Sequence, residues 1–315
     1  MAVRVAGIDC GTNSIRLLIA DVVDGRLRDV HREMRVVRLG EGVDATGRFS
    51  AQALERTRVA LADYAGLLAA HGVSGVRMVA TSATRDAANR DVFFDMTAQV
   101  LGEVIPGAVA EVITGTQEAE LSFRGAVGEL DSAEGPFVVV DLGGGSTEVV
   151  LGDSAGGVSA SYSANIGCVR LTERCLHSDP PTAREIAAAR DVARELLGEA
   201  VLAVPVQHAR TWVGVAGTMT TLSALAHGLT DYDPAVIHLS RIGLPGLLAV
   251  CDRLIAMTRT QRAALGPMHP GRVDVIGGGA IVVQELAHIL AERAGIAELV
   301  VSEHDILDGI VLSIA

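Results

Sequence analysis

A short pattern that occurs twice, 132 residues apart, constrains the fold of this chain more than any other feature of its sequence. The segments 9–14 (DCGTNS) and 141–146 (DLGGGS) share their aspartate, a glycine two residues later and their final serine. Each copy lies between the first two strands of a predicted three-strand antiparallel meander, and each meander is followed by helices and further strands. Motif and element order together predict two homologous α/β domains.

The first repeat is predicted from local signals. Its strands are expected at 4–9, 14–23, 26–39, 76–80 and 110–114, with Asp24-Gly25 as the hairpin turn between the second and the third. Its helices are expected from a Ser50 cap to Gly72, over 82–102 with a break near Asn89, and over 116–130.

The second repeat begins again with strand, glycine turn and strand over 136–153 and a third strand at 157–167. A capping box at Thr182–Glu185 predicts a long helix. Further predictions are a strand at 211–217 that runs into a glycine turn and a helix at 218–228, a glycine turn and helix at 275–295, a strand at 297–303 and a helix at 305–315. The turn-rich stretch 125–135 separates predicted domains 1–128 and 129–315, and the helix 305–315 is the element that could pack back on the first domain.

Composition excludes several classes of function. The net charge of −12 argues against a general nucleic-acid binder. All 26 basic residues are arginine, so a P-loop, which needs lysine, and lysine Schiff-base chemistry are excluded. No apolar run reaches the ~18 residues of a membrane span. The N-terminal residues do not resemble a signal peptide, and the four cysteines form no C-x-x-C pair, so we expect reduced thiols and a cytoplasmic location.

The two glycine turns predict a phosphate site. A glycine turn after a strand presents backbone N–H groups to an anion, and missing Cβ atoms let phosphate oxygens approach the chain. Two such turns would grip a phosphate from both sides of an interdomain cleft. The alternatives are tight turns without a ligand and, for the arginines, ordinary solvation. The predicted phosphate-binding residues are Gly11, Thr12, Asn13, Ser14, Arg16, Arg85, Gly143, Gly144, Gly145, Ser146, Gly217 and Thr218, with Gly277–Gly279 as a further candidate loop.

The acids beside these turns need a separate explanation. Asp9, Asp141 and Glu148 would repel a polyphosphate unless a cation lies between them, so they predict a Mg²⁺ site. The alternative is that they are solvated or paired with arginine. Glu118, in the first turn of a predicted helix, is the candidate general base, although helix N-termini also hold structural acids. The nine histidines show no metal-ligand spacing and receive no role.

The assembled motifs resemble the exopolyphosphatase / guanosine pentaphosphate phosphohydrolase family along the whole chain. The matching segments are 7–20, 80–90, 112–127, 139–152, 165–173, 214–225 and 302–312. The resemblance implies two actin-like, ribonuclease-H-like domains, Glu118 as catalytic residue, and phosphate loops at 9–16, 81–85 and 141–148. Gln117 stands where many members have a second glutamate. Leu307 and Asp308 stand where many have Arg-Glu, which puts a basic contact there in doubt.

We therefore expect an exopolyphosphatase that hydrolyses the terminal phosphoanhydride of inorganic polyphosphate with Mg²⁺ as cofactor. Short chains are the expected substrates because the additional helical domains of longer members are missing. Guanosine pentaphosphate hydrolysis, which would imply a role in the stringent response, uses the same site and remains open, as do an actin-like ATPase or kinase and a non-catalytic sensor. We expect a homodimer with no nucleic-acid or membrane partner, although the sequence itself does not determine oligomeric state.

Overall fold

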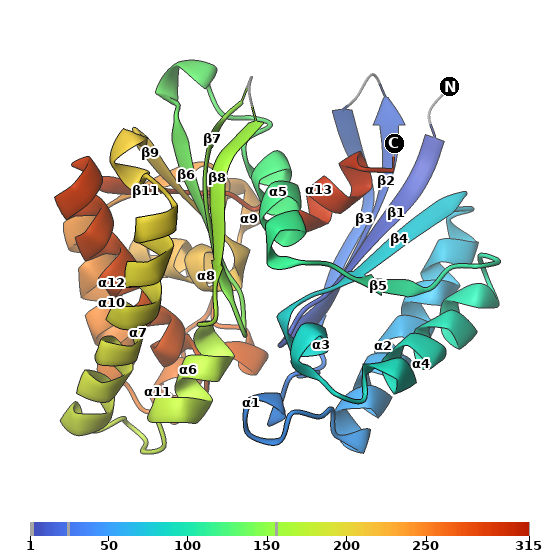
Figure 1. Ribbon diagram of the computed structural model, residues 1–315, viewed down its shortest axis with the longest axis horizontal. Coiled ribbons are helices and arrows are strands. Elements are labelled where there is room, and N and C mark those ends of the chain that lie inside the picture. Colours follow the sequence, from blue (N-terminus) through green and yellow to red (C-terminus); the bar gives the residue numbers. More distant parts are fainter. Residues whose placement is uncertain (1–2, 24–25, 155–156, 315) are drawn as a thin grey trace. The chain divides into compact units, whose positions relative to one another are not determined.

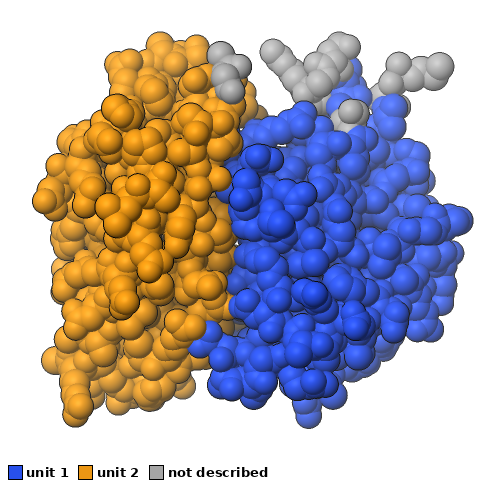
Figure 2. Space-filling model, viewed as in Figure 1, with its two compact units in different colours: residues 1–125, 306–315 blue, residues 126–305 orange. Residues whose placement is uncertain are grey.

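The computed structural model describes residues 3–23, 26–154 and 157–314, so the predicted turn at Asp24-Gly25 lies outside the described residues. The chain forms two compact units, coloured separately in Figure 2. Unit 1 contains residues 1–125 and 306–315, and unit 2 contains residues 126–305. The expected division at 128/129 thus lies three residues later than the observed one, and the last helix belongs to unit 1.

Unit 1 is built on a mixed five-stranded sheet in the order β3-β2-β1-β4-β5 (Figure 1). The first three strands are antiparallel neighbours, whereas β4 and β5 continue the sheet parallel to β1. The strands are β1 (Val3–Cys10), β2 (Ser14–Val23), β3 (Arg26–Val36), β4 (Gly75–Ala80) and β5 (Ala110–Val112). The helices are α1 (Val43–Thr46), α2 (Ala51–Ala70), α3 (Ser82–Asp86), α4 (Arg90–Gly102), α5 (Gly115–Ala126) and α13 (Ile306–Leu312).

Successive side chains of β1 and β2 point to opposite faces of this sheet, and both faces are buried. One face packs with α2 and α4 around Leu61, Tyr64 and Phe93. The other face receives α13, whose Leu307 and Val311 lie against β1 and β2. Ser50 caps α2 as expected, and the helix predicted over 82–102 does break near Asn89, where α3 gives way to α4.

Unit 2 has a six-stranded sheet in the order β10-β11-β9-β6-β7-β8. Its strands are β6 (Phe137–Leu142), β7 (Thr147–Asp153), β8 (Gly157–Ala164), β9 (Thr211–Val215), β10 (Ser240–Gly243) and β11 (Glu298–Val301). Its helices are α6 (Cys168–Cys175), α7 (Ala183–Ala203), α8 (Ala216–Ala226), α9 (Pro234–Ile237), α10 (Leu244–Ala256), α11 (Arg259–Ala263) and α12 (Ile276–Ala294). The helices α7, α10 and α12 pack over one face of the sheet (Figure 1).

The two sheets share one topology. In each, an antiparallel meander is extended by two strands parallel to its first strand: β4 and β5 in unit 1, and β9 and β11 in unit 2. Unit 2 adds β10 as an antiparallel edge strand. The repeat read from the sequence is therefore a repeat of fold, and the two-domain, actin-like α/β class is confirmed.

Two predicted glycine turns of unit 2 are wrong. Strand β9 passes directly into α8, so Gly217 lies in the first turn of a helix. Likewise, Gly277–Gly279 lie inside the first turns of α12. A Cβ on Gly278 would overlap the Thr172 hydroxyl of α6, and one on Gly279 would lie 2.7 Å from the Thr218 methyl of α8. These glycines let three helices approach closely, which is a second reason for a glycine run.

No helix among the described residues is long and apolar enough to cross a membrane.

Candidate active site

The parallel strands of unit 1 end in one row. Cys10, Ala80 and Val112 are register partners across β1, β4 and β5. In open α/β sheets, ligands bind beyond the carboxyl ends of the parallel strands. The segments that follow this row hold the predicted residues Gly11, Thr12, Asn13, Ser14, Arg85 and Glu118.

Glu118 and Arg85 meet at this edge. The Arg85 Nη1 donates to Glu118 Oε2 at 2.7 Å and to the Ile113 carbonyl at 3.0 Å. The carboxylate is buried, because the Glu118 side chain is only 10% exposed. A charge-assisted pair of this kind fixes both groups. From the sequence, Glu118 was predicted as a base and Arg85 as a phosphate ligand independently, and the fold places the two side chains in contact.

The residue before Glu118 has a different task. Gln117 Oε1 accepts hydrogen bonds from the Thr114 N–H at 2.9 Å and from the Thr114 hydroxyl at 3.1 Å, while the Gln117 N–H donates to Thr114 Oγ1. This is a capping box at the start of α5. Gln117 thus starts the helix that positions Glu118, and this explains how a glutamine fits where many family members are expected to have glutamate.

The β1–β2 turn is held in place by the segment that follows β3. The Thr12 carbonyl accepts the Gly40 N–H at 2.8 Å, and the Asn13 carbonyl accepts the N–H groups of Val37 and Arg38. Any Cβ on Gly40 would overlap the Thr12 methyl, so only glycine allows this approach. The turn is therefore a rigid platform for the side chains of Thr12 and Asn13.

Asp9 and Arg16 face each other across this hairpin. They are register partners, and Arg16 donates to Asp9 Oδ2 through Nη2 at 2.6 Å and Nε at 3.0 Å. The predicted metal ligand Asp9 and the predicted phosphate ligand Arg16 are thus engaged with each other in this structure. The alternative considered from the sequence, an acid paired with arginine, describes Asp9 here.

The equivalent hairpin of unit 2 has two acids at these places. Asp141 and Glu148 are register partners on β6 and β7, so their side chains emerge on the same face of the sheet. Both are buried, at 6% and 1% exposure, and Glu148 also accepts a hydrogen bond from the Ser163 hydroxyl at 2.7 Å. The hard carboxylate oxygens that this pair offers suit Mg²⁺. The donor set therefore fits the predicted cation.

The glycine loop between these acids is anchored from one side. The Gly143 and Gly144 carbonyls accept the N–H groups of Cys168, Val169 and Arg170 at 2.9–3.0 Å. Because C=O and N–H point in opposite directions across a trans peptide, the N–H groups of the next two residues point away from α6. This geometry agrees with an anion site at the loop. It also assigns a structural reason to one glycine, since a Cβ on Gly167 would overlap the Gly144 backbone.

Arg272, which the sequence did not single out, lies against the start of α8. Ala216 has φ +69°, an uncommon conformation for a residue with a side chain. A Cβ on the adjacent Gly217 would overlap the Arg272 guanidinium, so that arginine lies directly on the glycine. Arg272 also contributes, after burial, to lowering the pKa of His269 below its usual value. The sequence signal that pointed toward Arg272 was the absence of lysine, because every arginine is then a candidate phosphate ligand.

Leu307 and Asp308, which stand where many family members are expected to have Arg-Glu, have structural contacts in unit 1. Leu307 is buried in the core of unit 1, and Asp308 accepts a hydrogen bond from Arg32 on β3 at 2.5 Å. The position thus serves the packing of α13 on its sheet. Within unit 1, the predicted residues collect at one sheet edge, and within unit 2 the glycine loop, Gly217 and Thr218 follow the ends of neighbouring parallel strands.

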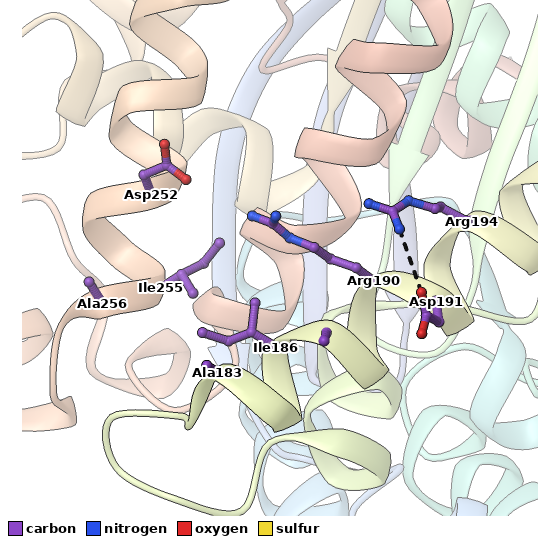
Figure 3. A pocket seen from close by; sticks show the side chains of 9 residues that line it. Ala183, Ile186, Arg190, Asp191, Arg194, Asp252, Ile255 and Ala256 are labelled. Atoms are coloured by element: carbon purple, nitrogen blue, oxygen red, sulfur yellow. Dashed lines mark hydrogen bonds and ion pairs between the residues drawn. The ribbon is translucent and has the colours of Figure 1, made fainter.

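One groove of unit 2 contains none of the predicted residues. It lies between α7 and α10, has a volume of about 490 Å³ and is shown in Figure 3. Arg190, Asp191 and Arg194 line one side, and Asp252 lies on the other. Gln284 and Glu285 of α12 hold the two arginines, so this groove is a structural contact region of three helices.

The model of the Ppx/GppA phosphatase family matches residues 18–314. The chain belongs to this family. An exopolyphosphatase 2 from Mycobacterium tuberculosis is 71% identical over 99% of this chain and 98% of its own length. A guanosine-5'-triphosphate,3'-diphosphate pyrophosphatase from Vibrio campbellii is 32% identical over 78% of this chain and 48% of its own length.

A solved structure supports the same placement. The crystal structure of an exopolyphosphatase-like protein is 46% identical, covers 100% of this chain and 98% of its own, and superposes with a TM-score of 0.95. The family predicted from the motifs is thereby confirmed. The roles of the individual site residues stay predictions.

Proposed function

We propose that this Ppx/GppA phosphatase is an exopolyphosphatase, which hydrolyses the terminal phosphoanhydride of inorganic polyphosphate and releases orthophosphate. The observation that carries the proposal is the buried Glu118 carboxylate, held by Arg85 beyond the carboxyl ends of the parallel strands. The exopolyphosphatase 2 that is 71% identical supports the choice of substrate.

Glu118 is the proposed general base. Its carboxylate takes a proton from water while the water oxygen attacks the terminal phosphorus. The bond from that phosphorus to the bridging oxygen breaks, and the shortened chain leaves with the bridging oxygen. In phosphoryl transfer, positioning and charge neutralisation supply most of the rate enhancement. Arg85, the glycine-loop N–H groups and Arg272 are the proposed donors to phosphate oxygens.

Asp141 and Glu148 are the proposed Mg²⁺ ligands. When bound, Mg²⁺ neutralises charge on phosphate oxygens and orients them. The opposed, buried pair supports this role. Asp9 is kept in the proposal as a third acid, but Arg16 already donates twice to its Oδ2.

The test is a conservative change of the base. E118Q keeps the size of the side chain and removes its ability to accept a proton, so phosphate release from polyphosphate with Mg²⁺ should fall about 10²–10⁴-fold. The matched control is E120Q, an exposed glutamate on the same helix, which should keep the wild-type rate. Both variants should be checked by thermal unfolding. Near-normal turnover of folded E118Q would contradict the assignment.

A second candidate is hydrolysis of the terminal phosphate of guanosine pentaphosphate. The similarity to the Vibrio campbellii guanosine-5'-triphosphate,3'-diphosphate pyrophosphatase supports this candidate. Phosphate release should be measured with polyphosphate, guanosine pentaphosphate and ATP as separate substrates, with and without Mg²⁺. A higher kcat/KM for the nucleotide than for polyphosphate would replace the first proposal with this one. Turnover of ATP alone would favour the actin-like ATPase.

The homodimer and the cytoplasmic location are also proposals. The family resemblance is the support for a dimer, which light scattering during gel filtration would measure. The four cysteines are free thiols in the structure, and this supports a reducing compartment.

A further inference from the structure

Three side chains that are distant in sequence converge on one point of unit 2. Glu129 precedes β6, His238 follows α9, and His304 follows β11. His238 Nε2 lies 3.1 Å from Glu129 Oε2, and His304 Nδ1 lies 3.5 Å from Glu129 Oε1. The two imidazole rings lie with their centroids 4.5 Å apart. We propose that these three residues form a binding site for a borderline-soft divalent cation of the Zn²⁺ class.

The spacing of the ligand atoms suits such an ion. Bonds of about 2.0–2.1 Å at tetrahedral angles separate neighbouring ligand atoms by about 3.3 Å. The two distances above bracket that value, and one ligand atom from each residue lies within 4.8 Å of the others. The two distances run to different oxygens of Glu129, so we expect side-chain rotations to bring one ligand atom of each residue onto the ion.

The donor types set this site apart from the proposed Mg²⁺ site. Two imidazoles and one carboxylate suit Zn²⁺, Co²⁺ or Ni²⁺, whereas Mg²⁺ requires hard oxygen ligands. Glu129 is 57% exposed and His304 is 31% exposed, which gives an ion access from solvent. The two sites therefore differ in metal preference as well as in residues.

Proton positions make the proposal more specific. His238 Nδ1 accepts the Glu303 N–H at 3.2 Å, which places the ring proton on Nε2, facing Glu129. A cation at Nε2 displaces that proton, and the neutral ring must then carry a proton on Nδ1. The Nδ1–H of His238 and the N–H of Glu303 would then both be donors facing each other, so the hydrogen bond between them must break. Metal binding thus has a signature at one backbone amide.

The consequence for the fold follows from where the ligands lie. Glu129 lies just after the chain enters unit 2 at residue 126, and His304 lies just before it leaves at residue 305. A bound ion fastens both segments to the turn at His238. This is a structural role, independent of the proposed hydrolysis, because none of the three residues belongs to the predicted catalytic set.

Direct binding to the untagged full chain, stripped of metal, tests the site. Zn²⁺ should bind competitively against a chromophoric chelator, and Co²⁺ should give tetrahedral d–d absorption. E129Q, H238Q and H304Q each remove a direct ligand, so each should weaken Zn²⁺ binding by at least the about 10–100-fold that loss of an outer-shell partner costs. The matched control is H31Q: His31 also lies 3.1 Å from a glutamate, Glu33, but belongs to no three-ligand group among the described residues.

Two further outcomes decide the proposal. A large excess of Mg²⁺ should leave Zn²⁺ in place, and the Glu303 amide should shift and exchange faster when Zn²⁺ is added. Wild-type affinity in folded H304Q, displacement by Mg²⁺, or a Glu303 amide resonance that does not move would each overturn it. Loss of hydrolysis in E118Q has no bearing on these measurements, so the two proposals fail separately.

Discussion

At the scale of single residues, several glycines are needed because another group lies where a Cβ would be, and that group differs from one glycine to the next. Gly167 admits the backbone of Gly144, Gly217 lies beneath the Arg272 guanidinium, and Gly7 receives the Ile310 and Val311 side chains of α13. Only in the first case is the neighbour an immovable backbone. The same substitution to alanine therefore has different consequences at different glycines.

G217A tests the contact with Arg272. The added methyl meets the far end of a flexible side chain, so the protein should fold while the guanidinium is displaced. Misplacing such a group by about 1 Å can cost about 10²-fold in kcat/KM. The pKa of His269 should rise, because burial lowers it first and Arg272 second. Steady-state kinetics and an NMR titration of His269 would measure both.

G198A is the matched control for that experiment. Gly198 lies within α7 with open space around its Cα. Alanine there should leave kinetics unchanged and stabilise the helix by about 0.5–1 kcal/mol. Equal loss of activity in both variants would contradict a specific role for Arg272.

At the scale of elements, local capping chemistry determines where important helices begin. The Thr182–Glu185 box at the start of α7 was predicted and is present. The backbone N–H of Thr182 is the main cause that lowers the pKa of Glu185 to about 2, and the N–H groups of His177 and Ser178 add to it. One carboxylate thus fixes both the first turn of α7 and the loop before it.

This pKa predicts an acid-sensitive contribution to stability. A carboxyl whose pKa is lower in the folded state than in the unfolded state stabilises the fold above the unfolded value, near 4.5. That contribution is lost as the pH falls from about 4.5 to about 2. The melting temperature of E185Q should therefore lie below that of the wild type at pH 7, and the gap should close over this window. E195Q, an exposed acid on α7, should show no such trend.

The sequence could predict features that depend on neighbouring residues, but not features that depend on tertiary contacts. Strands, caps and the break near Asn89 depend on near neighbours, and these predictions were confirmed. A glycine run has two causes, a turn or a close helix contact, and only the tertiary partners of Gly277–Gly279 decide between them. The helices α6 and α10 have no side-chain cap at their first turns, and neither was predicted. Residues join the candidate site in the same way: Glu118 was found by position, whereas its pairing with Arg85 required the fold.

At the scale of the whole molecule, unit 1 is discontinuous in sequence. Its sheet is completed on one face by α13, which follows all of unit 2. Arg32 on β3 reaches Asp308 on α13, and Gly309 lies so close to α5 that a Cβ would overlap the Leu121 carbonyl. These contacts explain why the chain closes back on its first unit.

D308N tests this closure. It neutralises the acceptor of the Arg32 Nη1 and Nη2 groups, while the Nε–Asp29 pair remains, and breaking a largely buried ion pair should lower the free energy of unfolding by about 2–3 kcal/mol. Arg32 is 31% exposed, which keeps the expected cost below that of a fully buried pair. Denaturant titration measures it. The control E111Q removes the exposed Arg77–Glu111 pair and should cost less than about 1 kcal/mol; an equal loss in both variants would contradict the assignment.

The position of α13 also sets an order of events during translation. Domains generally fold as units while the polypeptide emerges from the ribosome, and the N-terminal ones usually finish first. Here we expect the opposite order: the strands of unit 1 are made first, but the part of one sheet face over β1 and β2 stays uncovered until the helix at 306–312 has been synthesised. The contiguous unit 2 can mature in the meantime, so the half that is begun first is finished last.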